Sequence, residues 1–158
     1  MKSRNILIEK YIEPSEIMPE TDINFGFDSW LDRNGDRHSF MGQPAEISYE
    51  NGKIKNQFWY KKGERHRDGD LPARIGYDCN GQISYQEWYK KGVLHRDGDL
   101  PAEIFYDSNR QITYKGWYKK GKLHRDGDLP AEIWYYPSGE IKRQHWYKNG
   151  KFIKEENY

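Results

Sequence analysis

Four histidines with aspartates nearby are the first candidates for chemistry, because both residue types bind zinc and similar metals. They are His38, His66, His95 and His124, and the last three are 29 residues apart. If each repeat contributes two strands, equivalent positions lie two strand spacings apart, roughly 9 to 10 Å. Two ligands of one metal ion must lie within about 4 Å of each other. We therefore expect no metal site, and a structural role in which each histidine packs against or bonds a neighbouring turn.

The tripeptide Asp-Gly-Asp begins at Asp68, Asp97 and Asp126, and its carboxylates suggest calcium. An EF-hand needs roughly five ligand positions over about twelve residues, and the calcium-binding solenoid repeats have a different period. An arginine–carboxylate ladder, with aspartates capping Asp-Gly turns, explains the repeated Arg-Asp-Gly-Asp better. His-Arg-Asp also occurs in the kinase catalytic loop, but the other kinase motifs are absent from this sequence.

Cys79 is the one potential nucleophile of its type, and it lies in the turn Asp78-Cys79-Asn80-Gly81. Its counterparts one and two periods later are Ser108 and Pro137, so it is an ordinary turn residue. Near-identical units leave few unique polar residues for an asymmetric active site. We expect no catalytic residue, no cofactor and no enzymatic activity.

A Trp-Tyr pair followed by lysines recurs with the same spacing and marks the candidate partner-binding residues. Two interpretations stay open: the tryptophans pack on the repeated Pro or Leu residues in a second small core, or they form a partly exposed stripe. An exposed stripe would bind a partner protein, or stack single-stranded nucleic acid. We expect this stripe on the face opposite the Ala-Ile-Tyr residues, together with Phe105. The candidates are Trp59, Trp88, Trp117, Trp134 and Trp146, with Lys61, Lys62, Lys90, Lys91, Lys119 and Lys120.

The element that positions these residues is a tandem repeat of 29 residues. The block His-Arg-Asp-Gly-Asp-Leu-Pro-Ala starts identically at His66, His95 and His124, and His38 starts an eroded copy. The spacing defines a degenerate unit at about 30–58, units at about 59–87, 88–116 and 117–145, and a C-terminal cap at 146–158. Together they form one repeat domain, 29–158, preceded by an N-terminal arm or capping strand, 1–28.

Each unit shows the period of two that is typical of strands. Ala102, Ile104 and Tyr106 alternate with polar residues, and we place them on one face with Ile112 and Tyr114 of the next strand. Turns are expected around residues 107–110 and at Gly-containing sequences such as 119–122, where glycine supplies positive φ. Each unit is about one hairpin plus a connection. The sequence predicts an all-β fold, an antiparallel β-hairpin repeat stacked into an elongated, twisted meander.

Composition limits the function further. The chain has 26 basic and 25 acidic residues, which removes the simplest argument for nucleic acid or anionic membranes. Its 13 Tyr and 6 Trp supply apolar area, so we expect an ordered, mainly aromatic core. We see no signal peptide and no long apolar segment, and we expect a cytoplasmic protein.

The run Tyr114 to His124, followed by Arg125 to Ala131, resembles MORN-type repeats, with their Tyr-x-Gly start and aromatic-to-Gly turn. It looks like the longer variant found in repeat proteins of giant amoeba viruses and some bacteria. The resemblance covers roughly 30–153 and implies a β-hairpin solenoid for protein or lipid contacts, without catalytic residues. The unit of 29 residues is longer than the usual MORN repeat, and the Tyr-x-Gly glycine is replaced by Glu87 and Phe58 in other units.

Three hypotheses follow. The first is a non-enzymatic scaffold that binds an unidentified partner protein, as a viral or phage-like factor acting on a host component in the host cytoplasm. The second is a nucleic-acid binder that uses the Lys-Lys turns, and the third is a module for anionic membrane surfaces. Exposed sheet edges also allow self-association.

Overall fold

The computed structural model describes residues 25–158 and contains strands, turns and loops, with no helix among these residues. The predicted arm, 1–28, lies outside the described residues except for its last four positions. No helix in the described part of the chain is long and apolar enough to cross a membrane. The all-β prediction is confirmed.

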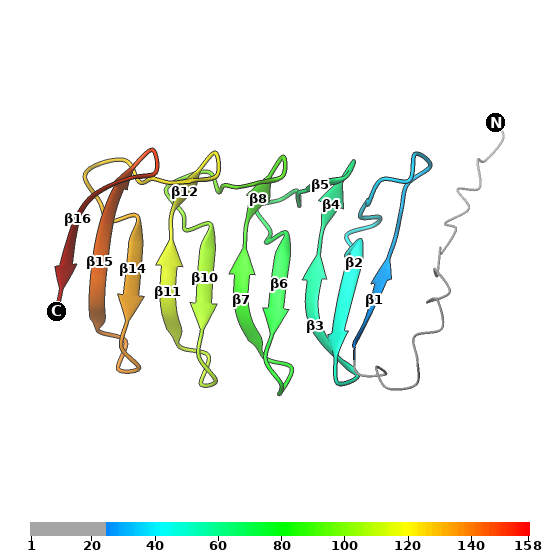
Figure 1. Ribbon diagram of the computed structural model, residues 1–158, viewed down its shortest axis with the longest axis horizontal. Helices are drawn as coiled ribbons and strands as arrows, with labels where there is room; N and C mark the ends of the chain where they lie inside the picture. Colours follow the sequence, from blue (N-terminus) through cyan, green and yellow to red (C-terminus); the bar gives the residue numbers. More distant parts are fainter. Residues whose placement is uncertain (1–24) are drawn as a thin grey trace.

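Ten strands form one antiparallel sheet in which every strand pairs with its neighbours in sequence order, as Figure 1 shows. The sheet is elongated along the direction in which the strands follow one another, so the predicted hairpin meander is also confirmed. The ten strands are β1 (Phe25–Ser29), β2 (Glu46–Glu50), β3 (Lys53–Phe58), β6 (Arg74–Tyr77), β7 (Ile83–Glu87), β10 (Glu103–Tyr106), β11 (Ile112–Gly116), β14 (Glu132–Tyr135), β15 (Ile141–Lys148) and β16 (Lys151–Asn157).

Three short ribbons lie along one rim of this sheet, at the top of Figure 1. Each has a two-residue turn with positive φ at both central residues, for example 53° at Lys120 and 76° at Gly121. Such turns match the right-handed twist of a hairpin. Each complete unit therefore holds two hairpins, a long one in the sheet and a short one at the rim. The ribbons pair β4 (Tyr60–Lys61) with β5 (Glu64–Arg65), β8 (Tyr89–Lys90) with β9 (Val93–Leu94), and β12 (Tyr118–Lys119) with β13 (Lys122–Leu123).

Two of the turns at the opposite rim, those of Asp78 and Asp107, are held by an aspartate side chain. Asp107 Oδ1 accepts hydrogen bonds from the backbone N–H groups of Asn109 and Gln111, at 2.8 and 2.9 Å. The pairing of the two strands shifts between Phe105 and Tyr106, just before this turn, so that Phe105 pairs with Tyr114 whereas Tyr106 pairs with Ile112. The same shift occurs in the other long hairpins. One extra residue in each returning strand makes a β-bulge there.

These bulges overturn the predicted assignment of faces. Tyr114 pairs with Phe105 and therefore shares its face, whereas strict alternation predicts Tyr114 on the face of Ile104. Trp117 follows Gly116, the partner of Glu103, and so lies on the face of Ala102 and Ile104. Because side chains alternate, a slip of one residue moves every later side chain to the other face. The tryptophans of the Trp-Tyr pairs therefore lie with the Ala-Ile residues, and Phe105 and Trp134 lie on the opposite face.

The core is thin. Trp59, Ala73 and Ile75 form a buried cluster, and the tyrosines Tyr77 and Tyr89 pack against it. No large side chain is completely buried in the described residues. A single sheet shields its side chains chiefly by lateral contacts between neighbouring strands, so one face stays available for contacts with other molecules.

Candidate functional site

The four tryptophans of the Trp-Tyr pairs are buried, with exposed fractions between 4 and 7%. Of the two interpretations, the partly exposed stripe is therefore wrong for Trp59, Trp88, Trp117 and Trp146, and the buried one holds for these four residues. Each indole N–H donates to a backbone carbonyl of the preceding connection, at 2.9–3.1 Å: Gly42, Asp70, Asp99 and Asp128 accept from them in chain order. The rings anchor each connection to the next unit.

A cation lies over each of these four tryptophan rings, a contact that the sequence analysis did not predict. The guanidinium groups of Arg67, Arg96 and Arg125 lie 3.8–4.0 Å from the ring centroids of Trp59, Trp88 and Trp117. At Trp146 the ammonium of Lys154 takes this place, at 4.2 Å. The repeated leucines Leu71, Leu100 and Leu129 remain between 42 and 47% exposed.

The predicted arginine–carboxylate ladder is present, and it joins successive units. Arg96 Nε and Nη2 donate to the two carboxylate oxygens of Asp70, both at 2.8 Å. Arg125 makes the same two-pronged contact with Asp99, at 2.8 and 2.9 Å. Each arginine is thus stacked on one unit's tryptophan and bonded to the carboxylate of the unit before. The hydrogen bonds from the guanidinium lower the pKa values of Asp70 and Asp99.

His38, His95 and His124 also connect units, as predicted, whereas the Nδ1 atom of His66 has no hydrogen-bond partner among the described residues. His124 Nε2 lies 2.9 Å from Asp126 Oδ1, and its Nδ1 accepts the backbone N–H of Asn149 at 3.2 Å. His95 contacts Asp97 and the turn of Lys120 in the same way. The acceptor role of Nδ1 selects the neutral tautomer that carries its proton on Nε2. Within residues 25–158, no group of three or more potential ligands could hold a metal ion.

The Lys-Lys turns lie on the rim ribbons, and the two lysines of each turn differ. Lys61, Lys90 and Lys119 each donate to an exposed aspartate seven residues later, at 2.6–2.9 Å. Hydrogen bonds from the lysine and then from the histidine lower the pKa values of these carboxyls, Asp68, Asp97 and Asp126. Lys62, Lys91 and Lys120 occupy the first positive-φ position of each turn and are exposed. The rim therefore alternates in charge, which weakens its attraction for a polyanion.

A second row of aromatic rings crosses the face opposite the tryptophan anchors. Tyr85, Phe105, Tyr114 and Trp134 are direct cross-strand neighbours on β7, β10, β11 and β14. Their successive ring centroids lie 5.9, 5.0 and 5.2 Å apart. Tyr114 is buried between its neighbours, whereas Phe105 is 37% exposed. The described residues place no second layer over this row.

Glutamates form a parallel row one pair position closer to the rim ribbons. Glu87 pairs with Glu103 across β7 and β10, and Glu132 follows beyond Gly116. Arg74 Nη1 lies 3.3 Å from Glu87, and Tyr114 donates to Glu132 at 2.9 Å. Burial raises the pKa of Glu103, and the charges of Glu87 and Glu132 raise it further, whereas a hydrogen bond from Tyr118 opposes the shift. Glu103 has no cation within 4.0 Å among the described residues.

Two glycines make room for these rows. A Cβ added at Gly76 would lie 2.1 Å from the Tyr85 ring, and one at Gly116 would lie 2.6 Å from the Tyr114 hydroxyl. These positions are therefore occupied by neighbouring tyrosines that lean across the strand. At the positions of these two glycines the other units have larger residues. The missing side chains at Gly76 and Gly116 were therefore the feature of the sequence that indicated the aromatic and glutamate rows.

We call the face that carries Tyr85, Phe105, Tyr114 and Trp134 the open face. Of the five tryptophans predicted to bind a partner, Trp134 is the one on this face, and the exposed lysines lie on the rim. Tyr85, Tyr114 and the glutamate row were not predicted as binding residues. The sequence matches no protein-family model, the sequence matches no curated protein, and the fold matches no solved structure. The resemblance to MORN-type repeats therefore rests on the residues alone.

Proposed function

We propose that this protein is a non-enzymatic scaffold that binds a partner protein on its open sheet face. The observation that carries this proposal is the aromatic row of Tyr85, Phe105, Tyr114 and Trp134 beside the glutamate row. Aromatic residues are enriched among the residues that dominate binding energy at protein interfaces. A second protein layer would complete the burial that a single sheet cannot provide.

The chemistry of the face selects the partner. Glu103 lacks a cation of its own and lies between two further glutamates, so an incoming lysine or arginine would compensate a partly buried charge. The same cation would lie beside the rings, where cation–π attraction contributes about 0.5–2 kcal/mol. We therefore infer that the partner presents a segment with basic and apolar side chains.

Selection of short random peptides displayed on phage tests this proposal. We expect the selected peptides to be enriched in Lys or Arg together with apolar residues, and to lose binding to the Phe105→Asp variant. Leu100→Asp is the matched control, because Leu100 is similarly exposed, at 42%, but lies outside the strands, in the connection between β9 and β10. Equal binding of the selected peptides to both variants and to the unchanged protein would refute the assignment of the face.

The alternative functions have a simple readout in the same preparation. Salt-dependent retention of a labelled single-stranded oligonucleotide, lost when Lys62, Lys91 and Lys120 are changed to Gln, would favour the nucleic-acid hypothesis. Flotation with anionic liposomes would favour the membrane-surface hypothesis. The pairing of Lys61, Lys90 and Lys119 with aspartates leads us to expect neither result.

A further inference from the structure

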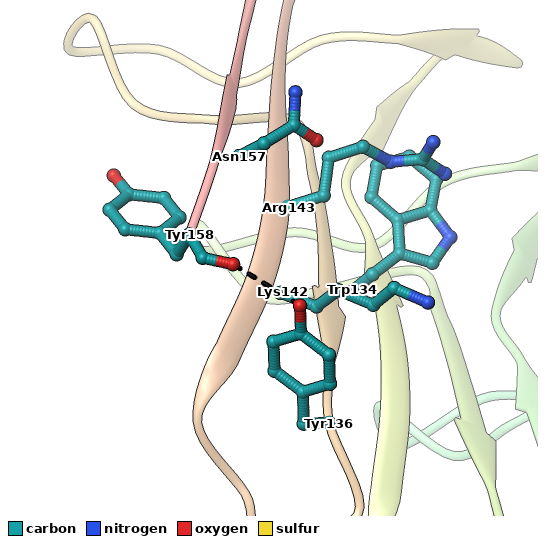
Figure 2. A pocket seen from close by; sticks show the side chains of 6 residues that line it. All are labelled: Trp134, Tyr136, Lys142, Arg143, Asn157 and Tyr158. Carbon is teal, nitrogen blue, oxygen red and sulfur yellow. Dashed lines mark hydrogen bonds between the residues drawn. The ribbon is translucent and has the colours of Figure 1, made fainter.

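A pocket of about 180 Å³ lies at the C-terminal end of the sheet, where β14, β15 and β16 meet (Figure 2). Figure 2 shows three aromatic rings, two cationic side chains and one amide around it. The lining residues are Trp134, Tyr136, Lys142, Arg143, Asn157 and Tyr158. This combination of flat apolar surface and positive charge is suited to a planar ring that carries an anion.

The two cations lack carboxylate partners. Neither Lys142 nor Arg143 has a carboxylate within 4.0 Å among the described residues, because the acidic groups of the adjacent strands are engaged elsewhere. Glu132 and Glu155 contact His145, at 3.2 and 3.3 Å, and Glu156 contacts Lys154 at 2.8 Å. The positive charge at the pocket is therefore available to an external anion.

Stacking leaves the donors of Arg143 accessible. Its guanidinium lies 4.2 Å from the centroid of the Trp134 ring, and the ammonium of Lys142 lies 5.6 Å from that of Tyr136. A guanidinium stacked on a ring keeps its N–H groups at its edges, where they can grip two oxygens of a phosphate. The tryptophan thus fixes the plane of the arginine before any ligand arrives.

The rings are also fixed by the protein itself. The Tyr136 hydroxyl donates to the main-chain oxygen of Tyr158 at 3.2 Å, shown as the dashed line in Figure 2. The Tyr158 backbone N–H donates to the carbonyl of Lys142 at 3.1 Å, and its hydroxyl hydrogen-bonds with Gln144 and Glu156, at 2.8 and 2.9 Å. A preformed site loses less conformational entropy when it binds.

Comparison with the earlier repeats shows that the pocket is specific to the last unit. At the position of Tyr136, the two preceding units have the turn-capping aspartates Asp107 and Asp78. At the positions of Lys142 and Arg143, they have Thr113 and Tyr114, and Ser84 and Tyr85. The last unit has therefore lost one carboxylate and gained two cations at a single place. The fold alone requires none of these changes, since the earlier hairpins form without them.

We propose that this pocket binds a phosphate group carried on a planar ring. Lys142 and Arg143 hold the phosphate by charge-assisted hydrogen bonds, while the ring packs against Tyr136 and Tyr158. Phosphotyrosine carries its phosphate directly on the ring, whereas a nucleotide joins its phosphate to a planar base through the ribose, so the two present the same pair of groups at different spacings. The proposal does not rest on the proposed function: Trp134 belongs to both the aromatic row and the pocket, but Lys142 and Arg143, which hold the anion, belong to the pocket alone.

The proposal can be tested by NMR, by adding phenyl phosphate to ¹⁵N-labelled protein. We expect saturable shifts at the backbone amides of Arg143 and Tyr158 and at the Trp134 indole, with weaker responses to phenol and to inorganic phosphate. The double variant Lys142→Gln and Arg143→Gln is expected to bind at least about tenfold more weakly. Lys148→Gln, a change of another exposed lysine on β15, is the control and should leave binding unchanged.

The variant Tyr136→Asp restores the residue of the earlier repeats, so it is expected to fold and to lose binding. Adenosine monophosphate and phosphotyrosine, titrated separately, identify which combination of a planar ring and a phosphate is preferred, and tighter binding of either supports the proposal. Absence of saturable shifts with phenyl phosphate would overturn it. Equal shifts with inorganic phosphate, unaffected by Tyr136→Asp, would also overturn it and indicate simple attraction of ions.

Discussion

The arginine–aspartate ladder is incomplete at its N-terminal end, and completing it should stabilise the protein. Arg67 lies over Trp59 like the other arginines, but no carboxylate contacts it among the described residues, and burial lowers its pKa. Gly42 occupies the place of the missing aspartate. Its carbonyl accepts the indole N–H of Trp59, as the carbonyl of Asp70 accepts that of the next unit.

Gly42 has a φ of 78°, at which an L side chain is strained, so an aspartate there requires a local change of the backbone. Met41 and Gly42 have φ values of 51° and 78°, whereas the equivalent Gly69 and Asp70 have 80° and 54°. The smaller φ value therefore comes first at residues 41 and 42 but second at residues 69 and 70. The double change Met41→Gly and Gly42→Asp would restore the order of the later units, and a Cβ at Gly42 would meet nothing within 4 Å.

The existing pairs set the magnitude. Arg96 donates twice to Asp70 at 2.8 Å, which favours the upper range for a hydrogen bond to a charged group, about 1.5–3 kcal/mol. The Asp70 side chain is 52% exposed, however, and exposed ion pairs contribute about 0.2–1 kcal/mol. Solvent screening therefore reduces the expected gain to about 1 kcal/mol. In a chain of this length this corresponds to a rise in Tm of about 2–4 °C.

Thermal and urea unfolding of two variants would measure this gain. Both carry Met41→Gly, and they differ in carrying Gly42→Asp or Gly42→Asn, so their difference isolates the charge. The gain is expected at neutral pH. It should disappear as the pH falls through the lowered pKa of the new carboxyl, because the stabilising form is the ionised one. Equal stability of the two variants at neutral pH, while Asp70→Asn destabilises the protein, would refute the reasoning.

Three further predictions concern the two faces. Glu103→Gln should raise the free energy of unfolding at neutral pH. In the unchanged protein the folded state holds the Glu103 proton more tightly than the unfolded chain, so stability should fall as the pH rises from about 4.5 through the raised pKa. Urea titrations of both proteins at several pH values would detect this difference. Gly76→Ala should lower Tm through overlap with the Tyr85 ring and cost about 1–3 kcal/mol, whereas Gly26→Ala, where a Cβ meets nothing within 4 Å, should change Tm little. Trp117→Phe should cost about 1–3 kcal/mol in urea unfolding, because it leaves a backbone carbonyl without its donor and weakens the arginine contact.

The repeat predicted the fold and the contacts between units well, because both depend on residues that recur. The Asp-Gly and Lys-Gly turns require particular backbone conformations, so their spacing determined where the chain reverses. The ladder of Arg96 and Asp70 and the ties made by His95 and His124 also followed from residue type and period. Period is a property of the sequence, and equivalent residues in a stack face equivalent neighbours.

The assignment of faces failed for a physical reason that the period does not contain. A bulge between Phe105 and Tyr106 changes the pairing by one residue while the 29-residue spacing stays the same. Strict alternation through the returning strand then put Tyr114 on the wrong face. The glycines opposite the bulky tyrosines, Gly76 above all, were the residues that could have corrected it, because a glycine inside a strand often marks close approach of a neighbour.

The repeat pattern does not predict the pocket, because the pocket is lined by residues that differ between units. Tyr136, Lys142 and Arg143 each depart from the two earlier units, and a comparison of the units position by position finds all three. Their proximity to Asn157 and Tyr158 could not be read from the repeat. That proximity depends on β16, which pairs along most of β15 in place of a further unit.

The separation of roles between the two faces explains why such a thin protein can carry binding surfaces at all. In a stack of repeats each unit contacts only its neighbours, so stability is approximately a sum of units and of the contacts between them. Here those contacts are made by the buried tryptophans, Arg96 and Arg125 with their aspartates, and the histidine ties, all on the rim or on the face of Ala102 and Ile104. Substitutions on the open face remove none of these contacts. Residues such as Phe105, and those that line the pocket, can therefore change while the stack of units persists. Substitutions there can alter the binding of a partner or a ligand without weakening the interactions that hold the units together.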